Sequence, residues 1–146
     1  MTGKSVWAIV AIAAVAILAY VIFGQTSTDQ AVPANEPSGG SAIVSVKIPE
    51  TLSERAQIGE LAFNAKCAVC HGPSAEGQNG VAPPLVHRIY EPNHHADIAF
   101  VLAAQNGVRS HHWTFGNMPP IEGLTKADVL NIATYIRELQ RENGIN

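Results

Sequence analysis

The sequence predicts an all-α protein: one N-terminal helix that spans a membrane, and three main helices in the rest of the chain. Two observations predict this class. An uncharged apolar segment covers residues 6–23. Towards the other end, apolar residues recur at the spacing of one helical face, at Val129, Ile132, Ala133, Ile136 and Leu139. Capping patterns, described below, place the start of two of the three main helices.

Residues 6–23 are predicted to form a retained transmembrane anchor. None of them is charged, and ten are Val, Ile, Leu or Phe. As a helix the segment would be ~27 Å long, close to the ~30 Å core of a bilayer, and insertion is favoured by roughly 3–6 kcal/mol. A cleaved signal peptide is the alternative, but its apolar region is shorter, and no small-x-small cleavage site follows Ala19. Lys4 precedes the segment and no Lys or Arg follows before Lys47, so the remainder is expected outside the cytoplasm.

We expect three parts in the chain: the anchor over residues 1–24, a flexible linker over 25–47 and a folded domain over 48–146. The linker is rich in Pro, Gly and small polar residues, which cannot bury enough apolar surface to fold. The chain of 146 residues is long enough for one domain plus these additions. Its net charge of −3 argues against nucleic acid as a partner, because nucleic acid is itself negatively charged.

The folded domain should contain three helices. The first is expected from residue 52 to about 67, with Thr51 and Glu54 as a capping box. The second is expected over residues 93–105 and ends at a glycine. The third opens at Thr125, with Asp128 three residues later as its capping partner.

Cys67-Ala68-Val69-Cys70-His71 is the motif on which the functional interpretation depends. Cys-x-x-Cys-His attaches c-type haem: two thiols form thioethers with the haem vinyl groups, and the adjoining imidazole binds the iron. The chain has two cysteines, and both are here. A thioredoxin-like pair would need a βαβ pattern, a zinc site would need a second ligand pair, and a disulfide would leave the histidine unexplained.

Met118 is the candidate for the ligand on the opposite side of the iron. The chain has two methionines, and Met1 is the initiator. Met118 follows Gly116 and precedes two prolines, which is typical of a loop. A thioether ligand favours ferrous iron and raises the reduction potential. The alternative for Met118 is an ordinary core side chain.

From about Pro49 to the C-terminus the chain resembles a class I cytochrome c of bacterial type. The similarity rests on ordered and spaced residues: Gly59, Phe63, the motif 67–71 with Gly72, Pro83-Pro84-Leu85, Met118-Pro119, Ile132 and Tyr135. It implies three main helices around one covalent haem c, with the face that holds Gly59 crossing the last helix. It also implies that the Pro83 carbonyl accepts the free ring N–H of His71. Trp113 lies just before Met118, either as a wall of the haem site that supports a propionate or as simple loop packing.

The remaining histidines depart from the family's usual pattern. They are His87, His94, His95, His111 and His112. Three interpretations stay open: surface histidines, an auxiliary copper or zinc site, and a pH-sensitive docking surface. The sequence leaves undecided whether the two adjacent pairs converge.

The resemblance implies a one-electron carrier and not an enzyme, with haem c attached through Cys67 and Cys70 and the iron held by His71 and Met118. With both axial positions filled, no small-molecule substrate would bind the iron. The expected location is the periplasmic side of the inner membrane, between a quinol-oxidising complex and a terminal oxidase or reductase of a respiratory chain. Two alternatives belong to other classes: a haem enzyme with an open iron position, and a metal-handling or sensing protein that uses the extra histidines.

Overall fold

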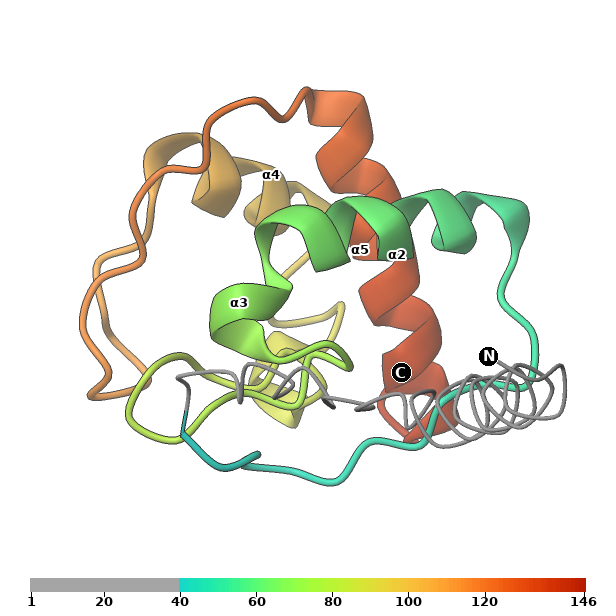
Figure 1. Cartoon of the computed structure of the whole chain (residues 1–146), viewed down its shortest axis with the longest axis horizontal. Coiled ribbons are helices and arrows are strands. Elements are labelled where there is room, and N and C mark those ends of the chain that lie inside the picture. The colour runs from blue at the N-terminus through green and yellow to red at the C-terminus, as the bar shows by residue number, and fades with distance from the viewer. Residues whose placement is uncertain (1–39) are drawn as a thin grey trace, which may run out of the picture. The chain divides into compact units, whose positions relative to one another are not determined.

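The computed structural model describes residues 40–146, and the predicted anchor and most of the predicted linker lie outside the described residues. The helices, labelled as in Figure 1, are α2 (Glu54–Lys66), α3 (Ala68–His71), the 3-10 helix η1 (Arg88–Tyr90), α4 (Asp97–Asn106) and α5 (Lys126–Glu142). The β-structure in this part of the chain amounts to three isolated antiparallel bridges. The all-α prediction is therefore confirmed for the folded domain. Within residues 40–146, no helix combines the length and apolar character needed to span a bilayer.

The crossing of α2 and α5 organises the core (Figure 1). Gly59 of α2 lies so close to α5 that an added Cβ would be 2.0 Å from the carbonyl oxygen of Asn131. One turn further on, the rings of Phe63 and Tyr135 pack with their centroids 5.6 Å apart. Both rings are almost fully buried. The close approach implied by the family resemblance is present, and it brings the C-terminal end of α2 into the centre of the domain.

The start of α2 differs from the prediction. Ser53 is the N-cap, and its hydroxyl accepts a hydrogen bond from the Ala56 N–H; the expected capping box of Thr51 with Glu54 is wrong. Glu138 of α5 favours Ser53 as the N-cap, because its carboxylate accepts hydrogen bonds from both the N–H and the hydroxyl of Ser53. A tertiary contact therefore supports Ser53 as the N-cap of α2.

The helix α4 begins four residues later than predicted, at Asp97 in place of residue 93. Residues 93–95 instead form a turn in which the N–H groups of His94 and His95 both donate to the Glu91 carbonyl. The predicted end at Gly107 is correct. The helix packs on the first turns of α5 through Val101, Ala104 and Val129.

The helix α5 begins as predicted. Thr125 and Asp128 form the reciprocal capping box, with the Asp128 N–H donating to the threonine hydroxyl and the Thr125 N–H donating to the carboxylate. The predicted apolar face is also correct, since Val129, Ile132, Ala133, Ile136 and Leu139 are all buried.

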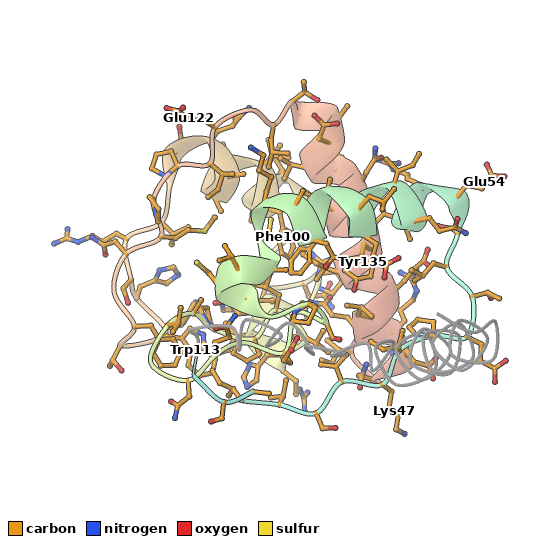
Figure 2. All side chains as sticks on the ribbon, in the orientation of Figure 1. Lys47, Glu54, Phe100, Trp113, Glu122 and Tyr135 are labelled. Carbon is orange, nitrogen blue, oxygen red and sulfur yellow. The ribbon has the colours of Figure 1, made fainter. Side chains whose placement is uncertain are left out.

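The chain before α2 lies against the domain from residue 41 onwards. Lys47 and Asn143 exchange two hydrogen bonds, which fix this segment near the end of α5 (Figure 2). The Val44 N–H donates to the Glu76 carbonyl, and Val46 packs on the main core. The ordered domain thus includes several residues that the sequence places in the linker.

Candidate cofactor-binding site

The Cys-x-x-Cys-His motif occupies the corner between α2 and α3. Cys67 ends α2, and its N–H donates to the Phe63 carbonyl at 2.7 Å. The next helical turn, from Cys67 to His71, is closed by a hydrogen bond of 2.9 Å from the His71 N–H to the Cys67 carbonyl. Because residues three and four apart share a helix face, Cys67, Cys70 and His71 project to one side and line one cavity.

His71 presents a neutral imidazole to that cavity. Its Nδ1 lies 2.8 Å from the Pro83 carbonyl oxygen, which is the contact that the resemblance implies. Burial lowers the pKa of His71, and the hydrogen bond to Pro83 only partly opposes this effect. The neutral ring donates its Nδ1 proton to the carbonyl, so Nε2 keeps a lone pair for a metal.

The loop from residue 72 to 85 holds Pro83 in place. The Gly77 N–H donates to the His71 carbonyl at 2.8 Å, and the Leu85 N–H donates to the Ala75 carbonyl at 2.8 Å. Gly77 has a φ of +75°, and a Cβ there would lie 2.4 Å from the Pro84 nitrogen. Only glycine combines this backbone conformation with such close contact. The His71–Pro83 hydrogen bond therefore depends on the conformation of the whole loop.

Met118 lies on the other chain segment that borders the cavity. It pairs with Val108 through two backbone hydrogen bonds of 2.9 and 3.0 Å, which close the base of the long α4–α5 loop. Gly107 permits this closure, since a Cβ there would lie 2.6 Å from the Met118 carbonyl oxygen. Met118 is half-buried, and it lines the same cavity as His71.

The cavity has a volume of about 500 Å³ and a mostly apolar lining. This is within the usual range for cofactor sites. The two thiols are free of any disulfide. Burial raises the pKa of Cys67 to about 11, with a smaller contribution from Cys70. A redox-active dithiol needs the opposite shift, so the thioredoxin-like alternative finds no support here.

The cytochrome c family model matches residues 56–140, which is more than half of the chain. The chain belongs to the cytochrome c family. No curated protein shows a significant match to it. The cofactor of this cytochrome is haem c, attached covalently through Cys67 and Cys70, whose spacing is that of the family motif.

A buried polar atom tests whether the cavity of this cytochrome fits haem. The indole Nε1 of Trp113 is shielded from solvent beside Tyr90, and it makes no hydrogen bond of standard geometry within the described residues. An N–H that is held so weakly can donate to an acceptor on a bound group. A haem propionate would be such an acceptor, and the apolar remainder of the lining suits the macrocycle. The residues present therefore fit the cofactor.

Trp113 packs against two other rings. It stacks on Phe115 with an interplanar angle of 13°, and it makes an edge-to-face contact with His87 at a centroid distance of 5.4 Å. Figure 2 shows it projecting from the α4–α5 loop towards the segment that follows α3. Trp113 thus forms part of the cavity wall, where the sequence left its role open.

Arg137 is a site-supporting residue that the sequence interpretation missed. It is 7% exposed and forms an ion pair with Asp97 at 2.8 Å. Its guanidinium also donates to the carbonyls of Tyr90 and His95. Its place beside the apolar face of α5, four residues after Ala133, is a signal that could have indicated burial.

The two histidine pairs converge, a point that the sequence left undecided. His94 and His95 come from the turn before α4, and His111 and His112 come from the α4–α5 loop. The closest rings across the two pairs are His94 and His112, with centroids 5.4 Å apart. The fifth histidine, His87, contacts Trp113 instead.

Proposed function

We propose that this cytochrome is a one-electron carrier with His71 and Met118 as the two axial ligands of its haem iron. The observation that carries the proposal is that two separate chain segments, α3 and the Val108–Met118 closure, present these side chains to one cavity. The bound haem supplies reversible exchange between ferric and ferrous iron. The protein's part is to keep His71 neutral and oriented through Pro83, and to exclude water with an apolar lining.

Met/His ligation distinguishes this function from that of a haem enzyme. A filled sixth position leaves no place for a small-molecule substrate on the iron. Thioether ligation also raises the potential relative to two imidazoles. The carrier proposal therefore makes a direct prediction about Met118.

The test compares Met118→Ala with Met118→His. The alanine variant should lose the far-red sulfur–iron absorbance of the ferric protein, and its potential should fall by several times ~59 mV, the value of a tenfold change for one electron. The histidine variant should remain low-spin but show a lowered potential, because only the kind of ligand has changed. An unchanged spectrum and potential in Met118→Ala would show that another residue is the ligand.

The alanine variant has a second informative readout. His111 and His112 line the same cavity as Met118 and are available as replacement ligands. If one of them binds, the variant becomes a low-spin bis-histidine species; if neither does, it becomes high-spin and gains peroxidase activity. Both results support Met118 as the native ligand.

The surface around the attachment site suits a transient redox partner. Val69 and Val81 are 77% and 39% exposed, and Cys70 between them is also exposed. Electron-transfer encounters use small interfaces, which exposed apolar residues beside the cofactor can provide. Cations are few here: Lys66, Arg88 and Arg109. We propose a quinol-oxidising complex as donor and a terminal oxidase or reductase as acceptor, in line with the family's respiratory role.

We further propose that residues 6–23 tether the cytochrome to the inner membrane of a bacterium, with the haem domain in the periplasm. The support is the uncharged apolar sequence and the lack of Lys or Arg between it and Lys47. Full-length protein should stay with membranes through salt and carbonate washing. Val15→Lys should weaken this association, since a central Lys costs about 2.5–3.5 kcal/mol of insertion free energy. A mature N-terminus beyond Phe23 would refute the tether.

A further inference from the structure

A cluster of imidazoles borders the haem cavity, apart from the proposed haem ligands. One ring nitrogen from each of His94, His95 and His112 lies within 4.8 Å of the other two. Their ring centroids are 4.7, 5.4 and 5.5 Å apart in the three pairs. The rings come from two segments separated in sequence by α4, so the fold, and not local chain geometry, brings them together.

His95 is oriented by its neighbours. Its Nδ1 lies 2.6 Å from the Ile89 carbonyl oxygen, so this nitrogen carries the proton and Nε2 is left as the potential ligand atom. The carbonyl of His95 itself accepts a hydrogen bond from the buried Arg137. Metal-binding histidines commonly show this arrangement, in which a backbone carbonyl fixes the tautomer and the ring orientation.

The histidine cluster takes no part in the ion pairs of the domain. Within residues 40–146 the two ion pairs involve Arg137 and Arg141, and neither includes a histidine. Three imidazoles that face one another without a carboxylate partner among the described residues leave ring nitrogens available to a shared cation.

We propose that His94, His95 and His112 bind one divalent first-row transition ion, Cu²⁺ or Zn²⁺. Imidazole nitrogens suit both ions. At a metal–nitrogen distance of about 2.0–2.1 Å, tetrahedral ligand atoms lie roughly 3.4 Å apart. The present separations therefore require small ring rotations, which His94 and His112 can make because both are exposed.

His111 lies next to the three proposed ligands but is not one of them. Its ring lies 4.1 Å from that of His112, centroid to centroid, but its Nδ1 is 2.9 Å from the Arg109 carbonyl oxygen. It stands outside the group of three whose ligand atoms converge. The site thus has three protein ligands and one position open to water or to His111.

The experiment titrates the full-length, haem-loaded protein with Zn²⁺ by calorimetry and with Cu²⁺ by electron paramagnetic resonance. We expect one equivalent of either ion to bind, with nitrogen hyperfine splitting in the Cu²⁺ spectrum. His95→Ala and His112→Ala should each weaken binding by at least the roughly 10–100-fold that loss of an outer-shell partner costs. The haem absorbance of each variant checks that the domain has folded.

Two further variants sharpen the result. His87→Asn is the matched control, because it removes an imidazole outside the cluster while the asparagine oxygen can still cap η1 by accepting from the Ile89 N–H; it should leave the affinity unchanged. His94→Ala removes an exposed ligand and is the variant least able to disturb folding. The proposal is overturned if wild-type protein binds neither ion stoichiometrically. It is also overturned if a folded His94→Ala or His95→Ala variant binds as tightly as wild type, or if His87→Asn weakens binding equally.

Discussion

Gly59→Ala tests the helix crossing that delivers Cys67 to the haem cavity. The new Cβ would lie 2.0, 2.4 and 2.9 Å from three backbone atoms of α5, the Asn131 oxygen and carbon and the Ile132 nitrogen. Ordinary contact needs about 3.5 Å, so the helices would have to separate by about 1.5 Å. None of the three atoms belongs to a flexible side chain that could move away.

The effect of Gly59→Ala on the free energy of unfolding is the difference between two opposing contributions. Alanine is the better helix former by about 1 kcal/mol, which favours the variant. Overpacking a close-packed core costs about 1–3 kcal/mol or more, and separation would also loosen the Phe63–Tyr135 contact one turn away. Because all three clashing atoms belong to the backbone, we expect the upper end of this cost, about 3 kcal/mol, so the free energy of unfolding should fall by about 2 kcal/mol after both terms.

Denaturant unfolding followed by helical circular dichroism and by haem absorbance measures this change. Leu61→Ala is the control on the same helix, because Leu61 is 73% exposed and should alter stability by less than about 0.5 kcal/mol. If Gly59→Ala were as stable as wild type, or more so, the helices would not cross as closely as described. The role assigned to Gly59 would then be wrong.

Three further outcomes follow from the structure. The capping hydrogen bonds from Thr125 hold the pKa of Asp128 below its ordinary value, so this carboxylate stabilises the fold above a pH of about 4. The stability difference between wild type and Asp128→Ala should shrink as pH falls through the folded-state pKa, as thermal melting at several pH values would show. Arg137→Met removes the donor of the His95 carbonyl and one of the two donors of the Tyr90 carbonyl, which keeps the Gln140 amide; it should cost about 1–3 kcal/mol in denaturant unfolding, and an unchanged midpoint would contradict this. Electron transfer to a purified partner should depend weakly on salt, because few exposed cations surround the attachment site; a steep, monotonic fall in rate would refute this.

The parts of the fold that the sequence predicted correctly are those encoded by local pattern. The capping box at Thr125, the stop at Gly107 and the apolar face of α5 each depend on residues within a few positions of one another. The attachment residues Cys67 and Cys70 were also predictable, because their chemistry depends on spacing within one helical turn. Interactions between residues a few positions apart in the sequence are enough to specify features of this size.

The features that the sequence could not supply depend on contacts between distant segments. Ser53 replaces Thr51 as a cap because Glu138 lies 85 residues away in the chain but within hydrogen-bond distance. Arg137 is buried because two carbonyls and Asp97 converge on it, and neither carbonyl has a signature in sequence. The convergence of the histidine pairs likewise needs α4 and the loop after it to be in place.

The proposed metal site and the haem should be coupled, because His95 and His112 line the same cavity as Met118. A bound Zn²⁺ adds positive charge beside the cofactor, and this disfavours the ferric state more than the ferrous state. The potential should therefore rise, and each ~59 mV of rise means that reduced protein binds Zn²⁺ tenfold more tightly than oxidised protein. Spectroelectrochemical titration with and without Zn²⁺ measures the shift directly, with His95→Ala as the variant that should not respond. If calorimetry shows that Zn²⁺ binds while the potential stays constant, the two sites are electrostatically independent and this coupling is wrong.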